Sequence, residues 1–353
     1  MFNKGGILIG LVTKIFSDFY YVKVDNVLFE CKLRELLKKT AVSVLVGDSV
    51  RIEPVDATHF QGAVVEVLPR KNSIQRPAIA NIDKVIVVAA LKEPEFDYIQ
   101  LNRYLTFAKL HNVNAVICVN KDDLGGNDSA REHIEKIYSS LGYEVIFTSA
   151  KENIGIERLE EVLSSGICVL CGQSGVGKSS LLNAILPGLN LKTKQVSSKT
   201  SRGTHTTRHT ELMEIPLQNG KIARVADTPG FSNLKFDSVL PDEVDMLFDE
   251  IYELSKGCKF NNCLHLEEEG CNVIAHFDEI LPYRYESYCA FVAEAIEAKE
   301  ATSAISLKNE SKIKVSGGKK LAKISSRKRE ESRKKSRQNL ANIDIEEDED
   351  GEF

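Results

Sequence analysis

The 353-residue sequence predicts a multidomain fold: a small N-terminal β-barrel, a central α/β domain with a mostly parallel sheet, and a C-terminal helical domain. Three observations predict it. Short alternating strands fill residues 1–68, buried strands alternate with helices around a glycine-rich turn in residues 81–235, and cysteine and histidine residues interrupt the helical pattern of residues 236–306. We expect a linker at 69–80, and disorder at 307–353, where charged residues replace aliphatic ones.

The N-terminal domain has the pattern of a five-stranded barrel, because β-branched residues alternate between turn signals such as Asp25-Asn26. The expected strands cover 7–15, 19–24, 27–31, 49–54 and 62–68, with a short helix between 29 and 46. Five strands in roughly sixty residues are typical of an OB-fold, a common platform for nucleic acid. The alternative is a barrel that serves only as a spacer or a protein contact.

The central domain follows a basic, proline-bounded segment. Its expected strands are 83–90, 114–119, 144–147 and 167–170, and its expected helices are 97–111, 128–141 and 155–163. Continuous apolar strands with helices between them indicate a parallel sheet that is covered on both faces. Two later strands, 211–216 and 221–226, should form a hairpin that turns at Asn219-Gly220.

The glycine-rich turn has the spacing of a phosphate-binding P-loop. It comprises Gly172, Gln173, Ser174, Gly175, Val176, Gly177, Lys178, Ser179 and Ser180. Its glycines would allow backbone N–H groups and a helix N-terminus to surround an anion. Lys178 would reach the β- and γ-phosphates, and the Ser179 hydroxyl would complete the shell of a Mg²⁺ ion. The alternative is a chance glycine-rich turn, against which the Lys-Ser pair and the flanking strand and helix argue.

Two tetrapeptides that follow predicted strands would read the base. They are Asn120-Lys121-Asp122-Asp123 and Thr148-Ser149-Ala150-Lys151. The Asp123 carboxylate can accept hydrogen bonds from the ring N–H and the exocyclic amine of guanine, a pattern that adenine lacks. Asn120 would tie the loop to the base and to the P-loop, Lys121 would lie across the purine, and the Ala150 N–H would contact guanine O6. Both motifs sit at strand ends beside a P-loop, which predicts a GTP site.

The remaining motifs would act on the γ-phosphate and on the Mg²⁺ ion. Asp227 begins an Asp-Thr-Pro-Gly sequence and would hold Mg²⁺ through water, while the Gly230 N–H would sense the γ-phosphate. Between the P-loop and this sequence, either Thr206 or Thr207 would coordinate Mg²⁺. We hypothesise that His205 positions the attacking water; a solvated or RNA-contacting histidine is an equal alternative.

The order of these motifs is circularly permuted, because the base-reading motifs precede the P-loop that ordinarily comes first. With the barrel before it and the cysteines behind it, the chain resembles the ribosome small-subunit-dependent GTPases, the RsgA/YjeQ family, over about residues 1–300. The resemblance implies an OB-fold, a central α/β P-loop GTPase with circular permutation and a helical zinc-binding domain. It also implies a GTP hydrolase that binds the 30S subunit and its 16S rRNA and assists late maturation, with hydrolysis stimulated by the subunit and triggering release.

Phe231 follows the Asp-Thr-Pro-Gly sequence at the position where Ras-like GTPases carry a water-orienting glutamine, so the isolated enzyme should be slow. A GTP-binding rRNA-binding assembly scaffold with negligible turnover is therefore an alternative function. A permuted GTPase of the large subunit is a further one, which the barrel and the cysteines disfavour.

The cysteine and histidine segment predicts one structural Zn²⁺ ion. Cys258, Cys263, His265 and Cys271 have the spacing C-x4-C-x-H-x5-C, and a Cys₃His set suits a closed tetrahedral site. The family resemblance implies the same ligands. The alternative is a loop of four unliganded side chains.

Composition suggests a cytoplasmic protein, because no apolar run approaches the ~20 residues that cross a bilayer and no secretory signal is recognisable. We also expect a monomer. The net charge of −5 is uneven, with 13 basic and 3 acidic residues at 308–337, then 7 acidic and no basic ones at 338–353. The basic segment either binds RNA or is a solvated charge run.

Overall fold

The structure is a computed structural model. It describes residues 6–39, 43–56, 58–75, 77–125, 128–186, 210–227, 234, 236, 239–308, 313–316 and 319–322. The chain divides into two compact units, Met1–Lys235 with Pro241–Val292, and Phe236–Leu240 with Ala293–Phe353.

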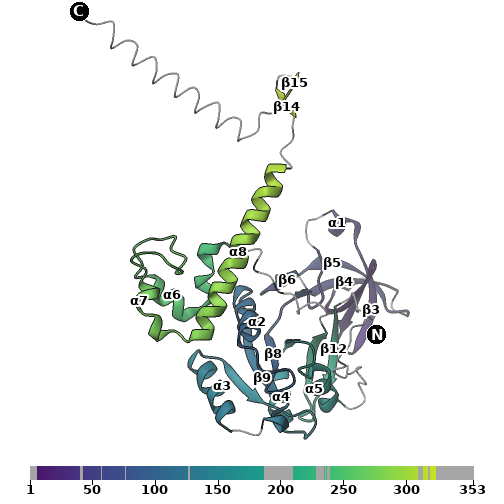
Figure 1. The fold of residues 1–353 in the computed structure, drawn as a ribbon. Coiled ribbons are helices and arrows are strands. Elements are labelled where there is room, and N and C mark those ends of the chain that lie inside the picture. The colour runs from purple at the N-terminus through teal and green to yellow at the C-terminus, as the bar shows by residue number, and fades with distance from the viewer. Residues whose placement is uncertain are drawn as a thin grey trace, which may run out of the picture. The chain divides into compact units, whose positions relative to one another are not determined.

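The first unit begins with a closed five-stranded barrel, which confirms the predicted architecture (Figure 1). Its strands are β1 (Leu8–Phe16), β2 (Phe19–Val24), β3 (Val27–Leu33), β4 (Ser49–Asp56) and β5 (Gln61–Val67), and α1 (Glu35–Lys38) lies between β3 and β4. The order β1-β2-β3-β5-β4 closes through pairing of β1 with β4, and only β3 and β5 pair in parallel. Alternate side chains such as Val22, Phe29 and Ile52 fill the interior.

The α/β domain contains a six-stranded portion of sheet in the order β10-β9-β8-β11-β13-β12. These strands are β8 (Lys84–Ala90), β9 (Asn114–Asn120), β10 (Glu144–Phe147), β11 (Ile167–Cys171), β12 (Glu211–Pro216) and β13 (Ile222–Asp227). Five of them are parallel, and β12 runs antiparallel to β13 in the predicted hairpin. Its turn places the Gly220 N–H 3.0 Å from the Leu217 carbonyl oxygen.

Helices cover both faces of this sheet, as the buried strands predict. They are α2 (Tyr98–Leu110), α3 (Asp128–Ser140), α4 (Ile156–Leu163) and α5 (Lys178–Ile185). Alternate residues of β8 point to opposite faces: Val85 and Val87 share a core with α2 and α3, whereas Ile86 and Val88 share one with α4 and α5. Because β8, β9, β10, β11 and β13 are parallel, their carboxyl ends lie at one common edge of the sheet.

Residues 69–80 form more than the predicted linker. They contain the antiparallel pair β6 (Ser73–Gln75) and β7 (Ala78–Ala80), in which Ile74 and Ile79 are buried in the same core as α2. The prolines and basic residues indicated a connector, but burial of two isoleucines holds the segment against the α/β domain. The barrel sheet also continues into the α/β sheet, where β1 pairs with β12 and Lys14 forms a 3.0 Å ion pair with Glu211.

The first unit ends with a helical subdomain. Its elements are η3 (Pro241–Glu243), η4 (Asp245–Leu247), α6 (Asp249–Ser255), α7 (Asn272–Ala275), η5 (Phe277–Glu279) and the start of α8 (Pro282–Lys308). The Phe248 ring packs against Tyr288 and Phe291 of α8, with ring centroids 5.7 and 5.9 Å away. These aromatic contacts fix the subdomain on the first turns of α8.

The second unit contains the remainder of α8 and the antiparallel pair β14 (Ile313–Ser316) and β15 (Lys319–Ala322). This hairpin lies in the segment that we predicted to be disordered. Apolar and polar residues alternate in Ile313–Ser316, which is a strand pattern, but the high charge of the segment favoured disorder. Among the described residues, no helix is long and apolar enough to cross a membrane.

Candidate nucleotide site and metal centre

The P-loop connects β11 to α5 at the carboxyl edge of the sheet. Gly172, Gly175 and Gly177 have φ angles of 142°, 89° and 97°, which other residues rarely adopt. A Cβ atom on Gly172 would lie 2.1 Å from the Val88 carbonyl oxygen. The loop therefore packs directly on the end of β8, and glycine is required for both its conformation and its proximity.

Lys178 is the first residue of α5, and its ammonium group folds back over the P-loop. Its Nζ atom donates to the carbonyl oxygens of Gly172 and Gln173 at 2.7 and 2.9 Å. Ser179 and Ser180 occupy the first turn of the same helix, where backbone N–H groups lack helical acceptors. One positive side chain and the positive end of a helix therefore lie together, as a triphosphate requires.

Asn120, the last residue of β9, links three loops. Its Nδ2 atom donates to the Val176 carbonyl oxygen of the P-loop at 2.8 Å. Its Oδ1 atom accepts from the Thr148 hydroxyl and from the Ala150 N–H, each at 3.3 Å. The predicted tie to the P-loop is thus present, and the Ala150 N–H, which we expected to face guanine, is directed to Asn120.

Asp123 lies beside the loop after β10. The Ser149 hydroxyl donates to its Oδ1 atom at 2.6 Å, and Lys151 Nζ lies 3.8 Å from its Oδ2 atom. A carboxylate held in this way can accept hydrogen bonds from the ring N–H and the exocyclic amine of guanine. Both tetrapeptides therefore act on one carboxylate, although 26 residues separate Ser149 from Asp123.

The two middle residues of the first tetrapeptide have different surroundings. Lys121 has a left-handed backbone conformation, and its ammonium group donates to the Glu93 carbonyl oxygen. The Asp122 carboxylate forms a 3.1 Å ion pair with Arg131 of α3. Asp122 therefore anchors the loop to α3, and base recognition is the role that we predict for Asp123 instead.

Asp227 is the last residue of β13, next to β11 in the sheet, so the structure brings its backbone to the edge that carries the P-loop. The other predicted catalytic residues, His205, Thr206, Thr207 and Gly230, lie outside the described residues, as does Phe231. Their roles stay predictions.

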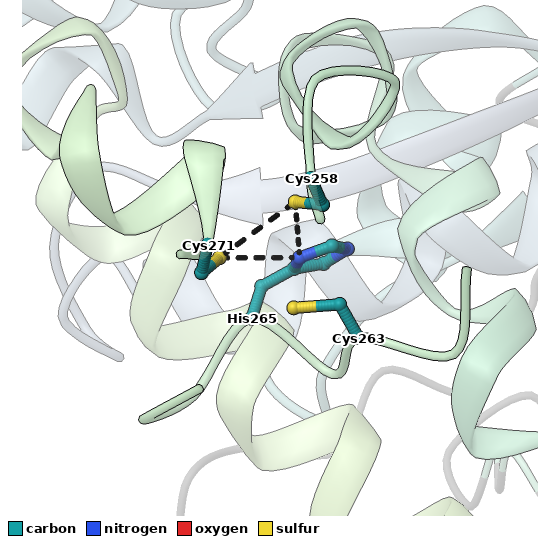
Figure 2. A group of neighbouring side chains, drawn as sticks. All are labelled: Cys258, Cys263, His265 and Cys271. Atoms are coloured by element: carbon teal, nitrogen blue, oxygen red, sulfur yellow. Dashed lines mark hydrogen bonds between the residues drawn. The ribbon is translucent and has the colours of Figure 1, made fainter. Parts of the chain in front are cut away.

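The four predicted zinc ligands converge in the helical subdomain, as Figure 2 shows. Their ligand atoms all lie within 4.8 Å of one another. His265 Nδ1 is 3.5 Å from the sulfur atoms of both Cys258 and Cys271, which are 3.8 Å apart. Three thiols and one imidazole at these separations are compatible with a tetrahedral Zn²⁺ site.

A second layer of side chains holds this cluster, and spacing alone did not reveal it. Asp245 Oδ2 lies 3.7 Å from His265 Nε2, the nitrogen that faces away from the thiols. From α8, Tyr285 and Tyr288 donate to the carbonyl oxygens of His265 and Leu264 at 2.7 and 2.8 Å. A carboxylate behind a ligand histidine is common in metal sites, where it fixes the tautomer.

The remaining cysteines differ from this cluster in their surroundings. Burial raises the pKa of Cys118, Cys168 and Cys31 to about 12, so these thiols are neutral at physiological pH. Each lies in an apolar core. They act as small hydrophobic side chains.

A P-loop that follows its base-reading motifs, on a sheet of this order, defines a circularly permuted GTPase. The model of the RsgA GTPase domain matches residues 67–237, and that of the RsgA N-terminal domain matches residues 9–62. The chain belongs to the RsgA family of GTPases and is a GTP-hydrolysing enzyme.

Curated relatives match most of the chain. The small ribosomal subunit biogenesis GTPase RsgA of Alkaliphilus metalliredigens is 40% identical over 287 residues, which cover 81% of this chain and 97% of the relative. The RsgA protein of Bacillus cereus is 41% identical over 295 residues, with coverage of 82% and 98%.

Two solved structures also match. YjeQ from Thermotoga maritima has a TM-score of 0.69 and 34% identity, with coverage of 82% of this chain and 99% of that chain. YloQ, described as a circularly permuted GTPase, has a TM-score of 0.66 and 32% identity, with coverage of 83% and 96%.

Proposed function

We propose that this GTPase binds the small ribosomal subunit during late maturation, and that the subunit stimulates GTP hydrolysis, which triggers release. The observation that carries the GTPase part of the proposal is the hydrogen bond from Asn120 to Val176, because it couples the loop that would read the base to the phosphate loop. Relatives about 40% identical over nearly their whole length are named small ribosomal subunit biogenesis GTPases, which supports the choice of partner.

Each part of the site would supply one element of the reaction. Asp123, held by Ser149, would select guanine, and Lys178 with the N-terminus of α5 would neutralise the β- and γ-phosphates. Ser179 and Asp227 would hold Mg²⁺, which would offset charge that develops on the phosphoryl oxygens. Catalysis by positioning and charge alone leaves the isolated enzyme slow, which fits activation by a partner.

The other domains would supply the contacts to the subunit. A closed OB-fold barrel and a rigid metal-bound loop are both suited to 16S rRNA. Cys258, Cys263, His265 and Cys271 would hold one Zn²⁺ ion with a structural role, because four protein ligands leave no open coordination position. We propose that the protein acts as a monomer in the cytoplasm, where the subunits mature.

Phosphate release from GTP, measured with and without purified 30S subunits, tests the proposal. We expect slow release alone, clear stimulation by 30S subunits, and no stimulation by 50S subunits. A Lys178→Ala variant should stay inactive with 30S subunits and serves as the control for contaminating GTPases. Binding to 30S subunits without stimulated release would favour the alternative, an assembly scaffold with negligible turnover.

A further inference from the structure

Arg103 of α2 joins two segments that are distant in the sequence. Its Nη1 atom donates to the Leu234 carbonyl oxygen at 3.2 Å. Its guanidinium carbon also lies 4.7 Å from the centroid of the Phe291 ring on α8. A single side chain therefore contacts the α/β domain's exit segment and the helical subdomain together.

Leu234 and Phe291, which Arg103 contacts, have distinct places in the protein. Leu234 is buried and lies seven positions after Asp227, at the end of the segment whose Gly230 should sense the γ-phosphate. Phe291 is fully buried and packs on Phe248 within the helical subdomain. One helical turn earlier, Tyr288 donates to Leu264 in the loop of zinc ligands. Contacts thus run continuously from the exit segment to the zinc loop.

A second set of bonds fixes α2 on α8 beside this contact. Asn102 Nδ2 donates to the Ser287 hydroxyl at 2.9 Å, and Arg284 Nη1 donates to Asn102 Oδ1 at 3.2 Å. Arg284 also donates to Glu250 of α6 from its Nε atom at 2.6 Å. Ser287 and Phe291 are one turn apart on α8. This network can therefore hold α2 and α8 together while the contacts of Arg103 change on the next turn of α8.

We propose that Arg103 is a positioning residue that couples the nucleotide state of the GTPase site to the start of α8 and the zinc loop. The proposal rests on the proposed GTPase function and adds the residue through which the γ-phosphate changes the helical subdomain. A planar guanidinium suits the position, since it can stack on a ring and donate in its own plane at once. Coupling requires a contact that differs between the GTP-bound and the GDP-bound state.

Hydrogen–deuterium exchange of the full chain, loaded with GDP or with a non-hydrolysable GTP analogue, tests the coupling without ribosomes. In the unaltered protein, we expect protection of residues 282–292 to differ between the two nucleotides by about twofold to thirtyfold, the size of the change that mutations along a coupling network can produce. In Arg103→Met the difference should disappear, while affinity for GDP stays the same. An undiminished difference in Arg103→Met, or no difference in the unaltered protein, overturns the proposal.

Two further variants keep the test specific. Lys109→Met removes another contact between α2 and the helical subdomain, the ion pair with Asp249, but does not reach Leu234, so the nucleotide-dependent difference should persist. Arg103→Lys keeps the charge over Phe291 without the planar fork and should restore part of the difference. A structural role for Arg103 predicts instead a lower melting temperature with the nucleotide difference intact. Stimulation of hydrolysis by 30S subunits is measured separately, so the proposed function and the coupling can fail independently.

Discussion

Asn120 and Val176 are 56 residues apart, and a 2.8 Å hydrogen bond joins the Asn120 amide to the Val176 carbonyl oxygen. The next residue in the P-loop, Gly177, packs on the same amide, since a Cβ atom at Gly177 would lie 2.3 Å from Asn120 Nδ2. The loop after β9, for which we propose base reading, therefore determines how closely the P-loop can approach it. A change in the position of the Asn120 amide should therefore affect base recognition and phosphate binding together.

Gly177→Ala should lower GTP affinity by more than about tenfold, because the new methyl group must displace the Asn120 amide from a loop with a left-handed φ. Isothermal titration calorimetry measures the loss. Gly220→Ala is the matched control: φ is +78° there, but no atom lies within 4 Å of the new methyl group. It should leave GTP affinity unchanged, and equal affinity in both variants would contradict the argument.

Asp123→Asn should change base specificity. Asparagine offers one donor and one acceptor, which suits the ring N–H and the added carbonyl oxygen of xanthine but not the two donors of guanine. We expect GTP affinity to fall by about a hundredfold and xanthosine triphosphate to become the preferred ligand. In competition binding, Asp122→Asn should retain the guanine preference, because Asp122 pairs with Arg131. A guanine preference in Asp123→Asn would exclude Asp123 as the base reader.

The sequence was sufficient for those features that depend on one segment at a time. Strand ends located Asn120, Ser149 and the P-loop at one edge, because all parallel strands of a sheet present their carboxyl ends together. The strands Phe19–Val24 and Glu144–Phe147 agree with prediction to the residue, since turn residues bound both.

Features that depend on two distant segments were not predictable in the same way. Asp245 stands behind His265 although no motif connects them, and Asn102 bonds with Arg284 across 182 positions. The strand pair within residues 69–80 was not predicted for a related reason, because only the fold shows that Ile74 and Ile79 are buried in a core. Packing between distant segments determines such contacts, and the local pattern of one segment carries little information about the segment that it packs against.

Arg284→Met should destabilise the protein by about 3–5 kcal/mol, the cost of removing one partner from a buried ion pair. Arg284 is only 2% exposed, and its loss leaves Glu250 and Asn102 without a donor that each now has. Arg158→Met is the control, since that side chain is 58% exposed and pairs with Glu144 and Glu161 in water. Its cost should stay below about 1 kcal/mol. Urea unfolding distinguishes the two; similar midpoints would mean that the buried network adds nothing.

Cys271→Ser should abolish binding of one zinc ion per chain and lower the melting temperature, because the hydroxyl of serine is a poor ligand and the loop loses one of four anchors. Native mass spectrometry reports the bound metal and calorimetry the melting temperature. Cys289→Ser provides the control, as Cys289 lies on α8 outside the cluster and should leave the zinc content at one. Full zinc content in Cys271→Ser would exclude Cys271 as a ligand.

Asp245→Asn should weaken zinc binding by about 10–100-fold without removing a ligand. Although burial alone raises the pKa of Asp245, interactions with His265, Ser255 and the Met246 N–H hold it below its usual value, so the carboxylate is ionised at neutral pH. An anion 3.7 Å from His265 Nε2 favours a proton on that nitrogen and leaves Nδ1 to face the thiols. A neutral amide can present its N–H instead, which favours the opposite tautomer.

Competition with a fluorescent chelator measures the zinc affinity of Asp245→Asn. Asp249→Asn, a loss of the same charge four residues away at the ion pair with Lys109, should leave it unchanged, and equal loss in both variants would reduce the effect to net charge.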